Sequence, residues 1–322
     1  MLRWVTLPSA RRGGQVDGDP PRASSPPAPA KRHRSIELRR FAGPSAHVGA
    51  LDGLRVAHLT DLHVGRVTPL AVQRDAVALT NAQRPDLVAL TGDFVCHSQQ
   101  HLDELTEVVR GFQAPVVGVL GNHDHWSGAK EVRRALARAG ALVLDNRHTT
   151  LELRGQRLQV VGLDDAYTGH ARLDEAVKGL RRDTPTLGLS HIGEEAEGLW
   201  AHGVPLVLSG HTHAGQVTLA RLHELAIGRL AGHRYVHGLY GRRSGSGAVY
   251  VGAGIGASVM PIRLGERGRR EVTLFELGAR PGSLPEHHDE QPPLPGRKRR
   301  APAARPRAPR GEAKKGARGR PR

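Results

Sequence analysis

The chain has 322 residues, a single cysteine and a formal net charge of +16. This length is enough for one large domain or two small ones, with a core that requires no disulfide bond. Cys96 has no second cysteine to pair with, which excludes an intrachain disulfide and agrees with a reducing compartment. Aromatic residues make up only 3% of the chain, so a surface for stacking successive nucleic-acid bases is poorly supplied.

The positive charge is concentrated at the two ends of the chain. Residues 1–50 carry a net charge of +6 and residues 296–322 a net charge of +11, which leaves −1 for residues 51–295. A nearly neutral middle part does not favour a polyanion-binding surface in the folded domain. The basic ends could instead hold the protein near an anionic membrane or a nucleic acid.

Composition divides the chain into three parts. Residues 1–34 and 280–322 are rich in Pro, Ala and Arg and are expected to be disordered tails, whereas residues 35–279 are expected to form the folded domain. No apolar run approaches the roughly 18 residues of a membrane span, and residues 1–50 lack the roughly 7–15-residue apolar stretch of a secretory signal. We therefore expect cytoplasmic residence, with peripheral contact at the inner membrane face as a second possibility.

Strand-like and helix-like runs alternate through the first half of this domain. Short apolar runs predict strands, and an apolar periodicity near 3.6 predicts helices between them. The predicted strands are 35–41, 54–59, 87–90 and 116–120. The predicted helices are 69–83, 101–112 and 129–139.

The second half is richer in strands. A hairpin is predicted from 151–153 and 158–161, and a helix near 172–182. Further strands are predicted at 186–189, 206–208, 216–219, 248–251 and 271–277. Alternating elements followed by more strands favour an α/β fold of stacked sheets with helices outside.

Five short segments rich in oxygen and imidazole ligands each directly follow one of the predicted strands. They are Asp61-Leu62-His63, Gly92-Asp93, Gly121-Asn122-His123-Asp124, Ser190-His191 and Gly210-His211-Thr212-His213. Sites of open α/β sheets lie beyond the carboxyl ends of the strands, so these side chains are expected at one edge. Ligands delivered in this way are what a two-metal hydrolytic site requires.

The residue types fit two sites that share a ligand. Asp61 and His63 would give an oxygen and a nitrogen to a first ion, and Asp93 has two oxygens with which to bridge two ions. Asn122 offers a neutral carbonyl oxygen to the second ion.

The remaining ligands are histidines. His191 would complete the set of the second ion, and His211 and His213, two apart, could face one metal each. Nitrogen and oxygen ligands without thiolate suit Mn, Fe, Zn or Co rather than an all-oxygen calcium site.

His123 and Asp124 are better explained as catalytic residues than as ligands. A histidine beside the metals can protonate a leaving oxygen, and an acidic neighbour could orient its ring.

Taken together, the residues of these five segments closely resemble the calcineurin-like metallophosphoesterase superfamily over roughly residues 50–277. The resemblance implies a four-layer α/β/β/α sandwich of two mixed β-sheets flanked by helices, with two divalent metal ions. It implies that a bridging hydroxide attacks phosphorus in line while His123 assists the leaving group. The implied ligands are Asp61, His63, Asp93 and His213 for the first ion, and Asp93, Asn122, His191 and His211 for the second.

Finer motifs resemble the bacterial YkuE/YaeI-type phosphodiesterase branch, which commonly has an N-terminal membrane or export segment. They are the segments 61–66, 162–165, 210–216, 252–256 and 261–263. That branch usually follows the fourth histidine with Asn-Pro-Asp, whereas this chain reads Ile192-Gly193-Glu194. The expected substrate is a phosphodiester: a small molecule, a nucleotide-sugar or a phospholipid.

Two other functions stay open. The basic tails could make the protein a nucleic-acid or anionic-membrane tether with the domain as a scaffold, or the domain could be a nuclease. Several individual residues also have two interpretations. Arg66 and Arg263 could contact a substrate phosphate or lie on the surface, and Tyr235 and Tyr240 could line the cleft mouth or pack in the core.

Overall fold

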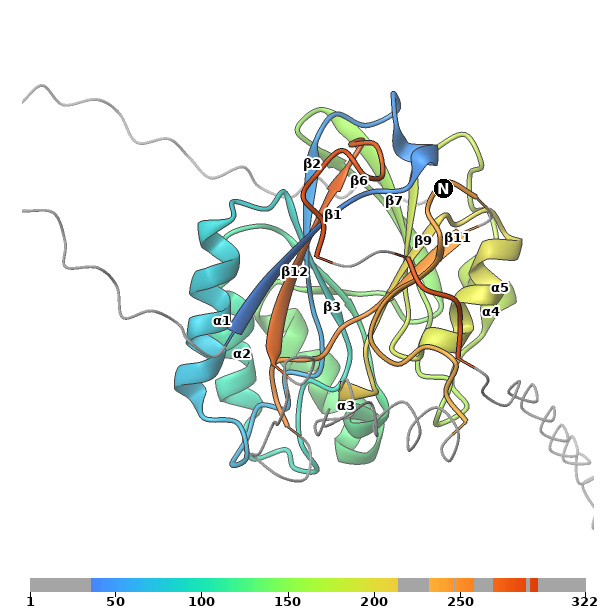
Figure 1. The fold of residues 1–322 in the computed structure, drawn as a ribbon. Helices are drawn as coiled ribbons and strands as arrows, with labels where there is room; N and C mark the ends of the chain where they lie inside the picture. The colour runs from blue at the N-terminus through green and yellow to red at the C-terminus, as the bar shows by residue number, and fades with distance from the viewer. Residues whose placement is uncertain (1–35, 214–231, 246, 258–268, 288–289, 295–322) are drawn as a thin grey trace, which may run out of the picture.

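The computed structural model describes residues 36–213, 232–245, 247–257, 269–287 and 290–294. Within them, two six-stranded sheets pack face to face (Figure 1). The first sheet has the order β1 (Ile36–Ala42), β12 (Arg270–Leu277), β2 (Leu54–Leu59), β3 (Leu87–Thr91), β4 (Val116–Val119) and β5 (Leu142–Val143). The second has the order β10 (Gly238–Arg242), β11 (Gly247–Val251), β9 (Leu206–Ser209), β8 (Thr186–Leu189), β7 (Gln156–Gly162) and β6 (Arg147–Leu153).

Both sheets are mixed. In the first, β2, β3, β4 and β5 are parallel neighbours, and β12 joins β2 in an antiparallel pair. In the second, β7, β8, β9 and β11 are parallel neighbours, with β6 and β10 antiparallel at the two edges. The carboxyl ends of the central parallel strands therefore lie at one edge of each sheet.

The alternation of side chains along buried strands produces the layers. In β3, Val88 and Leu90 pack against the helices α1 (Leu70–Ala82), α2 (Leu102–Arg110) and α3 (Asn122–Arg138). Leu87 and Ala89 of the same strand face the second sheet, as expected from the two-residue period of a strand.

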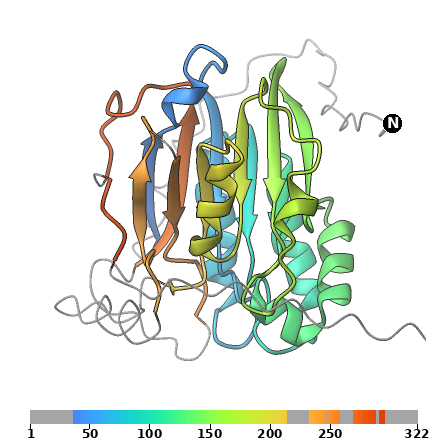
Figure 2. The same ribbon diagram turned by 90° about the vertical axis from the view of Figure 1, so that its right-hand side faces the viewer.

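The outer face of the second sheet is covered by α4 (Leu173–Ala176) and α5 (Ala196–Ala201). Figure 2 shows these two helices in front of that sheet. The fold is thus a four-layer α/β/β/α sandwich of two mixed sheets, and the predicted fold class is confirmed.

Most predicted elements are present, with differences where glycine interrupts a pattern. Helix α3 begins at Asn122, before the predicted start at residue 129, because Gly128 (φ 110°) kinks it and hides its first turns from the periodicity. Helix α4 is shorter than predicted and ends before Gly179, which has a positive φ. No pattern in the chain predicted β5, β10 or α5, which are short or contain glycine, and the predicted strand 216–219 lies outside the described residues.

The chain continues along the domain beyond residue 279, where the C-terminal tail was expected to begin. Arg243 is buried and donates hydrogen bonds to Glu286 (2.6 Å) and Glu290 (3.0 Å). The amide of Gln291 donates to the carbonyl of Leu239 in β10 at 3.0 Å. These contacts hold the described residues of 280–294 to the second sheet. None of the helices in the described part of the chain has the length and apolarity needed to cross a membrane.

Candidate metal centre

The loops that carry the predicted ligands meet between the two sheets. Asp61 and His63 follow β2, Asp93 follows β3 and Asn122 begins α3 after β4, all from the first sheet. His191 follows β8 and the pair His211 and His213 follows β9, from the second sheet. The two groups are joined directly, because Nδ1 of His191 donates to the carbonyl of Thr91 at 2.7 Å. The structure therefore brings all seven of these residues to one place.

Four of them form a buried cluster in which the ligand atoms lie within 4.8 Å of one another: Asp61, His63, Asp93 and His213. Nε2 of His213 lies 3.2 Å from Oδ1 of Asp61 and 3.0 Å from Nε2 of His63. Nε2 of His63 lies 3.6 Å from Oδ2 of Asp93. Carboxylate oxygens and imidazole nitrogens thus converge on a single point.

A second cluster shares Asp93 and adds His191 and His211. Nε2 of His191 lies 3.4 Å from Oδ2 of Asp93. Oδ1 of Asn122 lies 3.2 Å from that same nitrogen and 3.0 Å from Nδ1 of His211. Asp93 is therefore the residue common to both clusters.

The backbone at these positions is unusual. Nine non-glycine residues of the described chain have a positive φ, and five of them belong to the clusters: Asp61, His63, Asp93, His211 and His213. This left-handed conformation is uncommon outside glycine and collects at functional sites, where the surrounding structure enforces it. It also interrupts the two-residue alternation of a strand, so that side chains two positions apart need not point to the same face.

Glycines allow the loops to approach so closely. A Cβ on Gly210 would lie 1.9 Å from Oγ1 of Thr60 and 2.4 Å from Oδ2 of Asp61. A Cβ on Gly92 (φ 85°) would lie 2.7 Å from Nδ1 of His191. A side chain at either glycine would push the ligand loops apart.

The surrounding hydrogen bonds orient the ligand atoms. Oδ2 of Asp61 accepts from the hydroxyl of Thr60 (2.8 Å) and the amide of His211 (3.1 Å). Oδ1 of Asp61 is buried and accepts no hydrogen bond from the described residues. Leaving a carboxylate oxygen unsatisfied in the interior is costly unless a cation neutralises it. The residues present therefore fit a metal site.

The pKa values show how the site is charged without a cation. Burial lowers the pKa of His63 to about 3 and that of His211 well below its usual value, so both rings are neutral and able to act as ligands. Burial also opposes charge on His191 and Asp93, but the attraction between them is stronger. It raises the pKa of His191 to about 10 and lowers that of Asp93 well below its usual range.

His123 lies beside the clusters but belongs to neither of the two that share Asp93. Its ring is 4.8 Å from that of His63, and its Nε2 is 3.9 Å from Oδ2 of Asp93. Burial lowers its pKa. The ring is partly exposed, with 12% of the side chain accessible, so it can meet a bound molecule.

Asp124, expected to orient the His123 ring, accepts its hydrogen bonds from main-chain amides. Its Oδ1 accepts from the amides of Phe94 (2.8 Å) and Val95 (3.2 Å), and its Oδ2 from that of Gly121 (2.9 Å). It thereby ties the loop after β3 to the start of α3. Consecutive side chains on a helix do not face each other, which explains why this carboxylate does not reach the His123 ring.

The segment 192–194, which departs from the branch pattern, contacts residues 233 and 234 through Glu194. Glu194 is mostly buried and accepts from the amide of Arg234 at 2.8 Å, and its carboxylate lies 3.3 Å from Nδ1 of His233. The ring of His233 lies 5.2 Å from that of His211. Glu194 therefore fixes a segment beside the second cluster, a role without a sequence signal because the partners are 40 positions apart.

The tyrosines and arginines that had two interpretations lie in different surroundings. Tyr235 and Tyr240 are buried and pack in the core of the second sheet. Arg66 is exposed on the surface, and Arg263 lies outside the described residues.

Cys96 is a further neighbour of the centre. Its sulfur lies within 4.8 Å of ligand atoms of His63 and His123. Burial raises the pKa of this thiol.

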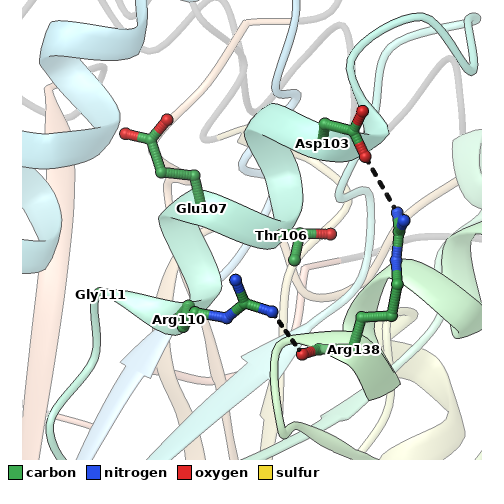
Figure 3. Close-up of a pocket in the computed structure, with 6 residues that line it drawn as sticks. All are labelled: Asp103, Thr106, Glu107, Arg110, Gly111 and Arg138. Carbon is green, nitrogen blue, oxygen red and sulfur yellow. Dashed lines mark hydrogen bonds and ion pairs between the residues drawn. The ribbon is translucent and has the colours of Figure 1, made fainter.

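One surface pocket lies elsewhere, between α2 and α3 (Figure 3). Its charged side chains pair locally: Arg138 with Asp103 at 3.1 Å, and Arg110 with the carbonyl of Arg138 at 2.9 Å. None of its lining residues belongs to the clusters, so it is not a candidate active site.

Two mixed sheets flanked by helices, with a buried His/Asp cluster beyond parallel strands, define a protein of the metallophosphoesterase type. The family model described as calcineurin-like phosphoesterase matches residues 54–215, a range that includes all seven predicted ligand residues. The chain belongs to this family and is therefore a metal-dependent phosphoester hydrolase.

Curated relatives place it in the YkuE/YaeI branch. It is 31% identical to phosphodiesterase YaeI of Escherichia coli over 76% of this chain and 87% of that protein. It is 29% identical to the uncharacterized metallophosphoesterase YkuE of Bacillus subtilis over 70% of this chain and 79% of that protein. Among solved structures, TT1561 of Thermus thermophilus resembles it with 16% identity and a TM-score of 0.43, covering 63% of this chain and 91% of that one.

Proposed function

We propose that the protein is a phosphodiesterase that works with two divalent ions bridged by Asp93. The observation that carries this proposal is the position of Oδ2 of Asp93, 3.6 Å from Nε2 of His63 and 3.4 Å from Nε2 of His191. One carboxylate oxygen thus faces both clusters. The preference for diesters is supported by the name of the relative YaeI, a phosphodiesterase.

Each ion would have four protein ligands from the residues described above. The first would take Asp61, His63, Asp93 and His213, and the second Asp93, Asn122, His191 and His211. The mixture of nitrogen and oxygen ligands suits Mn, Fe, Zn or Co. When bound, such ions supply Lewis-acid polarisation of the phosphoryl group and a water of lowered pKa.

The remaining residues of the site would position groups and move protons. His123 would give a proton to the leaving oxygen, a role supported by the partial exposure of its ring beside the clusters. Asp124 holds the loop that presents His123, through its hydrogen bonds to main-chain amides. Thr60 fixes the carboxylate of Asp61 so that Oδ1 faces the cluster.

The test is a substrate panel on the metal-loaded full chain. We expect hydrolysis of bis(4-nitrophenyl) phosphate at a higher kcat/KM than of 4-nitrophenyl phosphate, with no turnover after metal removal by a chelator. A higher kcat/KM for the monoester would refute the diester preference, and activity that survives chelation would refute the metal mechanism.

We also propose that the protein acts in the cytoplasm, where its basic ends would attract anionic membrane lipids. Cell fractionation at low and high salt tests this location, because electrostatic attachment weakens as salt rises. Recovery of the protein outside the cytoplasmic and salt-released fractions would contradict it.

A further inference from the structure

Two exposed aromatic side chains stand beside the metal centre. Trp126 is 55% exposed and Tyr167 is 52% exposed, and they are the exposed large hydrophobic residues in the described part of the chain. Large apolar rings left in water forgo the stabilisation that burial provides. Their presence together therefore marks a surface that becomes covered when something binds.

Ring contacts connect both side chains to residues of the centre. The ring of Trp126 lies 5.0 Å from that of His123, and the ring of Tyr167 lies 5.4 Å from that of His211. Trp126 and Tyr167 are 5.9 Å apart with an interplanar angle of 80°. We call this perpendicular pair the aromatic corner, and it borders the proposed proton donor as well as the second cluster.

The backbone on either side of the corner is held in place. Next to Trp126, the carbonyl of Ser127 accepts from Nε2 of Gln99 at 2.7 Å, just before the kink at Gly128. Next to Tyr167, the amide and hydroxyl of Thr168 donate to Oδ2 of Asp165 at 2.6 and 2.7 Å. The rings are thus exposed on a fixed frame, so little ordering is needed when a ligand covers them.

The shape of the corner selects the kind of ligand. Two perpendicular rings offer a flat molecule one face for stacking and one edge for a T-shaped contact, both favourable aromatic geometries. A lipid acyl chain requires a continuous aliphatic surface, and the described residues expose no large aliphatic side chain. A long nucleic acid requires many stacking platforms and a basic groove, whereas the corner consists of two rings.

We propose that the aromatic corner binds a single planar base, so that the substrates are phosphoesters of a nucleoside. This inference rests on the proposed phosphoesterase function and identifies the substrate class of the same site. Trp126 and Tyr167 are specificity-determining residues in this account, whereas the clusters and His123 act on the phosphate.

The test compares two ligands that differ only in the base, AMP and ribose 5-phosphate, by calorimetric titration of the Mn²⁺-loaded full chain. Chromatography after each titration checks that both ligands remain intact. AMP is expected to bind at least about tenfold more tightly than ribose 5-phosphate. The reason is that stacking of a base on aromatic side chains changes affinity on the order of tenfold or more. The variant Trp126→Ala/Tyr167→Ala is expected to abolish this preference without changing the affinity for ribose 5-phosphate.

The control variant Trp126→Phe/Tyr167→Phe keeps both rings and is expected to retain most of the preference. Equal affinities for the two ligands in the unaltered protein would overturn the inference, as would a preference that survives the double alanine change. Either result, with ribose 5-phosphate still bound, leaves the phosphoesterase proposal intact. Failure to bind ribose 5-phosphate together with no hydrolysis of bis(4-nitrophenyl) phosphate would overturn both.

Discussion

The main-chain amide of His123 donates a hydrogen bond to Oδ1 of Asp93 at 2.9 Å. This bond fixes the carboxylate and leaves Oδ2 directed at both clusters, near His63 and His191. The first turn of α3 therefore helps to orient the residue that the two clusters share. The Asp93 side chain thus contacts ligand residues from the loops of both sheets.

Replacing Asp93 with Asn tests this link. Asn can still accept a hydrogen bond from the His123 amide, but it has no negative charge to attract two cations. Because metal ions supply several kcal/mol of transition-state stabilisation, the rate of bis(4-nitrophenyl) phosphate hydrolysis should fall by roughly a thousandfold or more. The circular dichroism spectrum should be unchanged. Asp103→Asn, at an exposed carboxylate on α2, is the matched control and should keep full activity. Comparable turnover in both variants would refute the bridging role.

Thr60→Val should weaken metal binding while leaving the ligands in place. The hydroxyl of Thr60 donates to Asp61 at 2.8 Å, and valine has the same shape without the donor. Loss of such an outer partner typically reduces metal affinity by about 10–100-fold. Competition with a chelating dye measures the affinity. Thr184→Val, just before the start of β8 and so away from the ligands that follow the strand ends, should leave it unaltered. An equal effect of the two changes would contradict the role assigned to Thr60.

Glu194→Ala should affect the second cluster through the segment that Glu194 fixes. Without the bond to the Arg234 amide, His233 is no longer held beside His211, so KM for the diester should rise several-fold while kcat changes less. Glu194→Gln keeps an acceptor for that amide and should restore most of the affinity. A KM that is unchanged in the alanine variant would show that the segment does not shape the substrate side.

The sequence predicted most of the strands and the ligand loops because both depend on local patterns. Apolar runs such as 87–90 ended at Asp93 as expected, and the parallel pairing of β2, β3 and β4 then gathered the loops. What the sequence could not predict were relationships between distant segments. The bond from the Arg234 amide to Glu194 and the ring pair of Trp126 and Tyr167 leave no periodic trace in the chain.

The interpretation of Asp124 depended on where helix α3 begins. Its position beside His123 suggested that it orients the ring, but the helix begins at Asn122 and turns the two side chains apart. The early helix start was hidden because Gly128 interrupts the periodicity. The start of a helix therefore decides which neighbouring side chains can meet.

Stability should fall on mild acidification partly because of His47, which lies away from the metal centre. Burial lowers the pKa of His47 from 6.5 to about 4, and its Nε2 donates to the carbonyl of Thr186 at 3.1 Å. Below pH 6.5 the unfolded chain binds a proton here that the folded protein does not, so stability is lost as the pH falls toward 4. One such proton corresponds to up to about 1.4 kcal/mol per pH unit.

His47→Gln keeps a donor for that carbonyl but cannot ionise. Urea unfolding between pH 7 and pH 5 should therefore show a smaller loss of unfolding free energy in the variant than in the unaltered protein. His202→Gln, a change at a partly exposed ring, is the control and should not alter the dependence. Identical pH dependence in His47→Gln and the unaltered protein would show that His47 titrates normally in the folded state.

The most direct test of the central claim is the metal content of the purified chain. The apo-protein is loaded with Mn²⁺, passed through a desalting column and measured by mass spectrometry of the metal against protein concentration. The proposed centre, with Asp93 common to both clusters, predicts two ions per chain, with a loss of bound metal in Asp93→Asn but not in Asp103→Asn. One ion or none per chain in the active, unaltered protein would contradict the two-metal centre.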